Sequence, residues 1–434
     1  MHLLASHVSD TLPAYSTVGI GSEMSQKTVQ ASSQARLIVI GVALLLTLGM
    51  GIRQSFGLFL TPVSQDLTLT AADFTLTLAI QNIVWGLSQA FVGATADRYG
   101  LRITMIVGAA IYVVGLGIMA VAQGLFALIV SGSLIGVALS CTSTSLAIAA
   151  CVRAVSEQRR SMTLGLVSAA GSLGTVVVPL ATQALLAHQR WQIAVLLFVL
   201  MALVMLPAAF WAGAADKMPP RSMATSSMGE VLGQAIRNRQ FLVMSGAYFV
   251  CGLNLIFLTT HLPNYLAFCG QDPMLSAQAL AVIGGTSAVG SLVTGWLGAR
   301  YPKHILLGLM YIVRAIMFAA YFALPPTSTT TLLFAAAMGL FWWPGLVPLI
   351  GGLVAQIFGT RYLATLLGVS FVVHQVGSSL GAWGGGLIFD LSGSYEPAWQ
   401  IGTLIGFTAG VVQILAGGPT RRQDRTTVPA LATT

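Results

Sequence analysis

The sequence predicts an all-α membrane protein in which twelve transmembrane helices form two pseudo-symmetric six-helix bundles. Of its 434 residues, 56% are hydrophobic and only 7% are charged, and the mean hydropathy is +0.84, whereas charged residues make up about a quarter of a soluble chain. Twelve apolar stretches are long enough to cross a bilayer, which takes about 20 residues. Residue patterns of the first half also recur in the second. Together these features predict the fold class.

The twelve spans are expected at residues 37–61, 72–95, 103–123, 126–150, 162–186, 191–213, 241–267, 276–298, 304–324, 329–357, 362–389 and 397–417. Counted from an inside N-terminus, seventeen lysines and arginines fall in inner segments and Arg190 alone falls outside, while Arg53 and Arg314 lie within spans. Inner loops carry such an excess of positive charge. We therefore expect a multi-pass protein of the plasma or inner membrane with both termini in the cytoplasm. The net charge of +8 then indicates no nucleic-acid partner.

The two halves of the chain repeat one another at a steady offset. Such an offset over three helix pairs is typical of a duplicated six-helix unit. Gly51, Arg53, Phe56 and Pro62 match Gly252, Asn254, Phe257 and Pro263 at 201 residues, Gly93 and Arg98 match Gly295 and Arg300 at 202, and Gly165 and Gly174 match Gly368 and Gly377 at 203.

The repeat divides the chain into an N-terminal bundle at 36–213 and a C-terminal bundle at 241–417. Residues 214–240 are polar and basic and contain two adjacent prolines, which predicts a cytoplasmic linker. Residues 1–35 are rich in serine and threonine and lack the features of a signal peptide, so we expect a disordered cytoplasmic tail. Residues 418–434 are expected to form a second cytoplasmic tail. The chain is expected to work as a monomer.

The loop after the second span reads GATADRYGLR, residues 93–102. This pattern resembles the signature of the major facilitator superfamily between its second and third helices. The resemblance implies a gating motif, in which Gly93 permits close helix approach, Asp97 caps a neighbouring helix N-terminus, and Arg98 and Arg102 hold the cytoplasmic gate around Gly100. The alternative is an ordinary positively charged inner turn.

Four further stretches resemble the monocarboxylate and oxalate/formate porter group, including its bacterial branch: RQSFGLFL, THLPNYL, YIVRA and HQVGSSLGAWGGGLIFDLSGSY. The resemblance implies transport of a small organic anion, with Arg53 at the place where these proteins use a basic residue near the carboxylate. They also carry an arginine in the eighth helix, often with an aspartate one turn before it. This chain departs from that pattern, because Ser291 and Ser287 stand there.

Arg53 is the main candidate for substrate binding. A guanidinium stays charged at any accessible pH, and placing it at bilayer depth costs about 2.5–3.5 kcal/mol, so it is expected to face a polar interior. Gln81 and Asn82 fall at a similar depth in the second span. They are expected to line the cavity with Arg53, which would receive a carboxylate through two parallel hydrogen bonds. The alternative is that both amides satisfy Arg53 and tie the first helix to the second.

Other polar residues inside spans are weaker candidates. Asn254, the repeat mate of Arg53, is expected to face the same cavity or to serve in helix packing. His374 and Gln375 lie in the eleventh span, and imidazole gains or loses a proton near neutrality, so His374 is a candidate proton carrier. A core histidine that donates to a carbonyl is the alternative. His261, near the outer end of its span, is interpreted as a gate or structural residue before a ligand.

Two further positions are expected to contact substrate or to be structural. Arg314 lies in the ninth span, which is peripheral in the superfamily, so tying that helix to its neighbours is favoured over substrate contact. Trp342 and Trp343 lie within the tenth span. They would stack on a planar substrate or fill the core of the second bundle.

Several function classes are disfavoured by what the sequence lacks. No aspartate or glutamate lies in the middle of a span, although a drug/proton antiporter that selects cations should have one. The sequence contains no phosphate-binding loop and no catalytic constellation, so neither an enzyme nor a cofactor is expected. Its four cysteines predict neither a metal site nor a disulfide framework.

These observations predict a secondary transporter that moves a small organic anion by alternating access, as proton symport or anion exchange. One alternative is an exporter of a neutral or aromatic metabolite or drug, with Arg53 satisfied internally. The other is a ligand sensor that does not transport.

Overall fold

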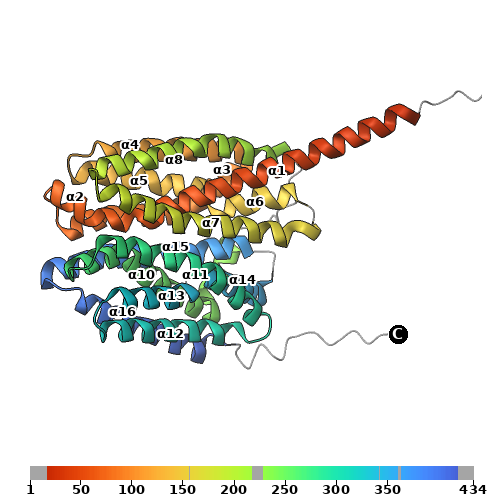
Figure 1. Cartoon of the computed structure of the whole chain (residues 1–434). Coiled ribbons are helices and arrows are strands. Elements are labelled where there is room, and N and C mark those ends of the chain that lie inside the picture. The colour runs from red at the N-terminus through yellow and green to blue at the C-terminus, as the bar shows by residue number, and fades with distance from the viewer. Residues whose placement is uncertain (1–16, 156, 218–227, 342, 360–362, 419–434) are drawn as a thin grey trace, which may run out of the picture.

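The computed structural model of the protein describes residues 17–155, 157–217, 228–341, 343–359 and 363–418. Within these ranges every regular element is a helix (Figure 1). The elements of the first half are α1 Thr17–Ser55, the 3-10 helix η1 Phe56–Phe59, α2 Leu60–Asp66, α3 Ala71–Tyr99, α4 Leu101–Ala120, α5 Leu125–Cys141, α6 Thr144–Ala154, α7 Glu157–Leu186, α8 Trp191–Ala212 and the 3-10 helix η2 Gly213–Lys217. Those of the second half are α9 Met228–Arg237, α10 Arg239–Phe268, α11 Pro273–Gly298, α12 Lys303–Phe322, α13 Ser328–Leu340, α14 Trp343–Phe358, α15 Leu363–Ser392 and α16 Glu396–Ala416.

The all-α membrane class predicted from the sequence is confirmed. In the described part of the chain, eleven segments are long and apolar enough to cross a membrane. The expected span at 72–95, which lies within α3, is not among these eleven because it is less apolar. Gln81, Asn82 and Gln89 make this helix more polar. Because α3 packs between α5 of its own bundle and α15 of the other, it is shielded by protein.

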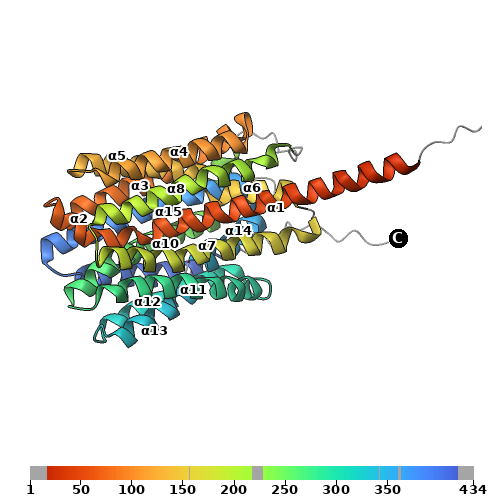
Figure 2. The same cartoon turned by 45° about the horizontal axis from the view of Figure 1, so that its top comes forward.

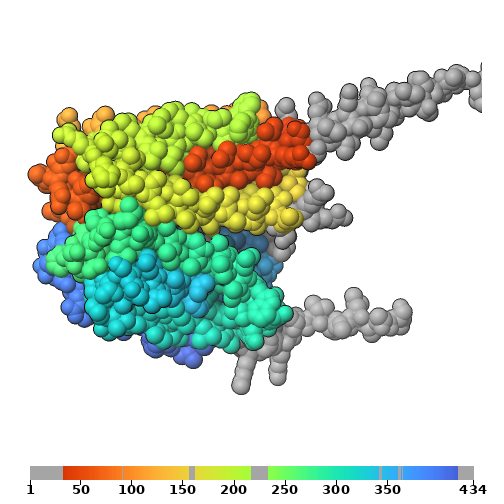
Figure 3. All heavy atoms as spheres, viewed as in Figure 1, coloured from red at the N-terminus to blue at the C-terminus, as the bar shows by residue number. Residues whose placement is uncertain are grey.

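The helices form two stacked halves, with α1–α8 on one side and α10–α16 on the other (Figures 1 and 3). Within the first half α1 packs on α7 and α3 on α5; within the second α10 packs on α15 and α12 on α16. Two helix pairs cross between the halves, α3 with α15 and α7 with α11. After the turn shown in Figure 2, α4 and α5 lie at one edge and α12 and α13 at the other. The seam between the halves is therefore built mainly from α3, α7, α11 and α15, with further contacts from α10 to η1 and α2.

Three of the expected spans are interrupted. The first changes from α-helix to 3-10 helix at Phe56. The fourth breaks between Cys141 and Thr144, and the tenth breaks next to Phe341. Hydropathy measures the apolar content of a stretch and not its hydrogen-bond register, so the sequence pattern did not reveal these breaks.

The N-terminal region differs from the expected disordered tail. Helix α1 begins at Thr17, so residues 17–35 extend the first membrane helix (Figure 1). Adding residues to a helix that already exists avoids the cost of nucleation, which polar composition alone does not reveal. The expected tails at 1–16 and 419–434 lie outside the described residues. The expected linker contains η2 at its start and α9 near its end, and residues 218–227 between them are likewise outside the description.

Candidate functional site

Arg53 lies in the last turn of α1, directly before the change to 3-10 geometry. Its Nη2 donates to Oδ1 of Asn82 at 3.5 Å, at the long end of a hydrogen bond, and its guanidinium stands 4.8 Å from the centre of the Trp85 ring. Both partners belong to α3. The single ion pair in the described part of the chain joins Arg153 to Asp216, so no described carboxylate neutralises Arg53. The site is therefore cationic and backed by an aromatic face.

A second group of polar residues comes from α15 of the other half. His374 is buried, with Nδ1 3.1 Å from Oε1 of Gln375 and 3.4 Å from Oγ of Ser378. Its ring lies 4.4 Å from that of Tyr248 and is stacked on Phe371 at 5.9 Å. These contacts fix the position of the imidazole on the inner face of α15.

Aromatic rings connect the two groups across the seam. Trp85 of α3 meets Phe371 of α15 edge to face, with ring centres 5.2 Å apart. At the next residue, a Cβ on Gly86 would lie 2.9 Å from Cβ of Gln375, so only glycine allows the helices to come this close. The structure thus links Arg53 and Asn82 to the polar group on α15 through intermediate contacts. Trp85 meets Phe371, which stacks on His374, and Gly86 packs on Gln375. Sequence analysis missed Trp85 and Phe371, although an aromatic residue one turn after Asn82 was a visible signal.

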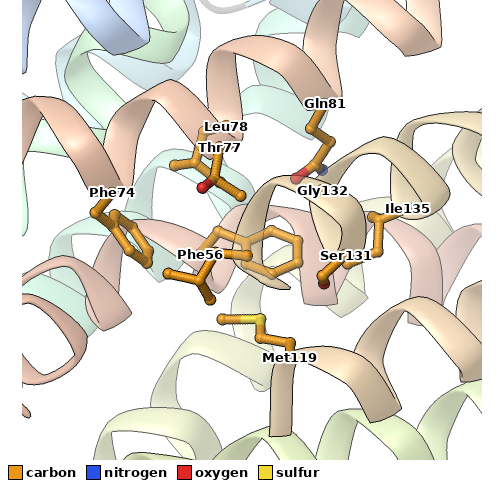
Figure 4. A pocket seen from close by; sticks show the side chains of 10 residues that line it. Phe56, Phe74, Thr77, Leu78, Gln81, Met119, Ser131, Gly132 and Ile135 are labelled. Carbon is orange, nitrogen blue, oxygen red and sulfur yellow. The ribbon is translucent and has the colours of Figure 1, made fainter. Parts of the chain in front are cut away.

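Gln81 does not lie beside Arg53. It borders a small cavity inside the N-terminal half, together with Phe56, Thr77 and Ser131 (Figure 4). Consecutive helical residues point about 100° apart, since there are ~3.6 residues per turn, so Gln81 and Asn82 cannot share one face. The expectation that both line one wall with Arg53 is corrected for Gln81.

Asn254 is directed into the C-terminal half. Its Nδ2 donates to the carbonyl of Gly402 in α16 at 3.3 Å, and a Cβ on Gly406 would lie 3.0 Å from the same nitrogen. The contacts fit the alternative that Asn254 joins two helices. Asn254 occupies the position of the repeat that matches Arg53, but its side chain bonds to α16, whereas Arg53 bonds to α3.

Arg314 points inward from α12 and is only 2% exposed. Its Nη1 donates to Sγ of Cys251 at 3.4 Å, and Tyr311 lies beside it. The interpretation that Arg314 ties α12 to its neighbours fits these contacts, because Cys251 belongs to α10.

His261 belongs to a separate polar network toward the end of the molecule that carries α2. Its Nε2 lies 2.7 Å from the carbonyl oxygen of Ala382, and its Nδ1 lies 3.2 Å from the hydroxyl of Tyr395. Asn264 donates to that hydroxyl at 2.7 Å and accepts from Thr61 of the other half at 2.8 Å. These contacts fit the gate or structural interpretation of His261. Tyr395 and Asn264 lie in stretches that resemble the porter group, but the sequence gave no sign that they meet.

The expected gating motif lies at the opposite end. Asp97 and Arg98 are exposed on the last turns of α3, and a Cβ added to Gly93 would meet nothing within 4 Å. Gly100 has φ +93°, which favours glycine, and it ends the helix. The expectation of close helix approach at Gly93 is therefore corrected. Among the residues that the structure describes, Asp97 makes no hydrogen bond to a helix N-terminus, and its capping role stays a prediction.

Asp216 of η2 takes the capping role near the motif. Its Oδ1 accepts from the amide of Leu101 at 2.8 Å and its Oδ2 from the amide of Arg102 at 2.9 Å, at the start of α4. Arg153 pairs with the same carboxylate at 3.4 Å. The Arg102 guanidinium lies 4.3 Å from the Phe210 ring centre. An aspartate 115 residues away from Leu101 supplies this cap, a distance over which sequence pattern gives no guidance. Trp342 and the side chain of Trp343 lie outside the described residues.

Known proteins resemble this chain in sequence and in fold. The family model of the Major Facilitator Superfamily matches residues 40–382. An uncharacterised MFS-type transporter, YcxA of Bacillus subtilis, is 22% identical over 382 residues, which is 85% of this chain and 91% of the relative. Monocarboxylate transporter 13 of Bos taurus is 25% identical over 375 residues, covering 84% and 85% of the two chains. Among solved structures, a bacterial homologue of the human lysosomal transporter Spinster, inward-facing and unoccupied, has a TM-score of 0.67 at 16% identity, covering 88% of this chain and 95% of that one.

Proposed function

The chain belongs to the major facilitator superfamily, and we propose that this transporter moves a small organic anion, of the monocarboxylate or a related carboxylate class. The two halves would alternate access to a site between them, which is the general mode of transporters built from repeated bundles. The transporter assignment itself rests on the family and its relatives, which are not enzymes.

Arg53 is the observation that carries the proposal. Its recorded hydrogen bond goes to an amide oxygen, and its other neighbour is the face of Trp85. Arg53 is half-buried, and a cation partly withdrawn from water without a carboxylate partner has lost hydration that these two contacts restore only in part. A substrate carboxylate would supply the missing charge and accept from the remaining donors, which are arranged as a planar fork. The names of the monocarboxylate transporter relatives support the same class of substrate.

Coupling to protons or exchange of anions both fit this site. We propose His374 as the proton carrier, because imidazole gains or loses a proton near neutrality and the positive field of Arg53 would keep it neutral while the site is empty. An entering carboxylate would offset that positive field and favour protonation of the imidazole. Anion and proton would then bind cooperatively, and by reciprocity low pH would tighten anion binding. Exchange of one anion for another needs only Arg53.

A second candidate is export of a neutral or aromatic compound. The observation that favours it is the series of rings Trp85, Phe371, His374 and Tyr248 along the seam. Such a surface would stack on a planar body while Asn82 and Trp85 satisfy Arg53. In that case the affinity of the protein would not depend on the charge of the ligand.

The test uses purified full-length protein in a thermal-shift screen of carboxylates, each paired with its neutral amide. Hits are then measured by counterflow in proteoliposomes for wild type, Arg53→Gln and the control Arg190→Gln, which removes a charge from an exposed loop. We expect carboxylates to stabilise and exchange, Arg53→Gln to abolish both effects while remaining folded, and Arg190→Gln to resemble wild type. Normal counterflow by Arg53→Gln would reject the anion site, and equal stabilisation by acid and amide would favour the second candidate.

A further inference from the structure

Asp390, in the last turn of α15, makes two hydrogen bonds to the other half of the molecule. Its Oδ1 accepts from the backbone amide of Ala71 at 3.1 Å, and its Oδ2 accepts from the amide of Ala72 at 2.7 Å. Both amides are in the first turn of α3. The carboxylate of the C-terminal half thus caps a helix of the N-terminal half. It lies at the end of the molecule that carries α2, which the charge pattern predicts to face outside.

The first turn of α3 leaves these two amides without a partner from their own helix. The first four amides of a helix have no intrahelical acceptor. Thr70 and Asp73 form a capping box, in which the Thr70 hydroxyl accepts from the amide of Asp73 and the Asp73 carboxylate accepts from the amide of Thr70. This local motif does not serve Ala71 or Ala72. Asp390 therefore completes the cap, and its negative charge lies at the positive end of the helix dipole.

Close backbone packing surrounds this contact. A Cβ on Gly386, one turn before Asp390, would lie 2.9 Å from both the carbonyl carbon and the carbonyl oxygen of Ala71. About two turns before Gly386 on α15, the hydroxyl of Ser379 donates to the carbonyl of Ala79 in α3 at 2.8 Å. The seam of α3 and α15 therefore continues from Asp390 inward to Gln375 and Gly86, beside the candidate site. Any motion that opens this end for substrate has to break the two hydrogen bonds of Asp390 as well as the bond from Thr61 to Asn264.

We propose that Asp390 is the gate residue that holds this end of the transporter closed, through its bonds to the amides of Ala71 and Ala72. Loss of these bonds shifts the resting protein toward the conformation that is open at the α2 end. The inference uses alternating access but not the identity of the substrate. It is tested without substrate, so its failure would leave the anion proposal standing.

The experiment measures the distance between the two halves at this end. Spin labels are placed at Gln65→Cys in α2 and Thr329→Cys in α13, both exposed positions in different halves. Distance distributions are recorded by pulsed electron resonance on full-length protein in nanodiscs, in a Cys269→Ser background because Cys269 is the one partly exposed cysteine among the four. Asp390→Asn keeps the size of the side chain and removes its charge. Since hydrogen bonds to charged groups are the stronger ones, the ratio of open to closed molecules should rise about tenfold.

Two further variants separate a gate from a merely structural contact. Asp66→Asn is the matched control, because Asp66 accepts from Trp191 and Gln192 at the same end but within one half; it should leave the distances unchanged. Ala71→Pro removes one of the two donors at the first helical position, where proline is well tolerated, and should shift the distances in the same direction as Asp390→Asn. Unchanged distances in both Asp390→Asn and Ala71→Pro would overturn the proposal. An equal shift in Asp66→Asn would also overturn it.

Discussion

Replacement of Asp216 by alanine should destabilise the N-terminal half, whereas the same change at Asp97 should not. Asp216 makes two hydrogen bonds to the amides of Leu101 and Arg102 and an ion pair with Arg153. Asp97 is exposed at the end of α3. The pair of variants therefore asks which aspartate near the gating motif stabilises the start of α4.

The magnitude follows from the contacts. Loss of a capping side chain costs about 1 kcal/mol, with a range of roughly 0.5–2 kcal/mol, and here two amides lose their acceptor. The ion pair adds little, about 0.5 kcal/mol, because the Arg153 and Asp216 side chains keep 19% and 28% of their exposure and water screens the charges. We expect a loss of about 2 kcal/mol for Asp216→Ala. An exposed substitution such as Asp97→Ala typically changes stability by no more than about 0.5 kcal/mol.

The assay heats detergent-solubilised full-length protein and measures the fraction that remains monodisperse. A loss of about 2 kcal/mol corresponds to a decrease of the apparent melting temperature of about 4–8 °C for a folding unit of 150–250 residues. Asp216→Asn serves as an intermediate, since its amide oxygen still accepts one bond. The reasoning is refuted if Asp97→Ala lowers the melting temperature as much as Asp216→Ala, or if Asp216→Ala has the stability of wild type.

Three other predictions concern the transport cycle and the site. Asp97→Asn should reduce the rate of the conformational cycle more than it weakens substrate binding, because the motif lies far from Arg53. Counterflow measures the rate and thermal-shift titration measures the affinity. A large loss of affinity at an unchanged rate would mean that Asp97 is not a gating residue. His374→Gln should abolish stimulation of uptake by an imposed pH gradient if protons are carried; wild-type uptake that ignores the gradient but responds to internal anion would reject symport. Asn254→Ala should lower stability by about 1 kcal/mol, since it removes a buried hydrogen bond to α16. The affinity for the anion should stay within twofold of wild type. A large loss of affinity at wild-type stability would mean that Asn254 binds substrate.

The sequence by itself determined the class of the protein and the elements of the fold. Apolar stretches of spanning length, a repeat at offsets of 201–203 residues and the distribution of basic residues are properties of composition and spacing, which do not depend on contacts. A guanidinium inside a span was also sufficient to mark Arg53 and Arg314 as candidates, because its cost in hydrocarbon is a property of the residue and its depth. The family resemblance then favoured Arg53.

Only the tertiary structure decided which side chains meet. Gln81 and Asn82 are neighbours in the chain, yet Asn82 accepts from Arg53 while Gln81 borders a cavity inside the N-terminal half. The helix caps made by Asp216 and Asp390 join positions more than a hundred residues apart. Spacing along a helix fixes which residues share a face, but the partner of that face depends on how whole helices pack, and short-range sequence pattern carries no information about it.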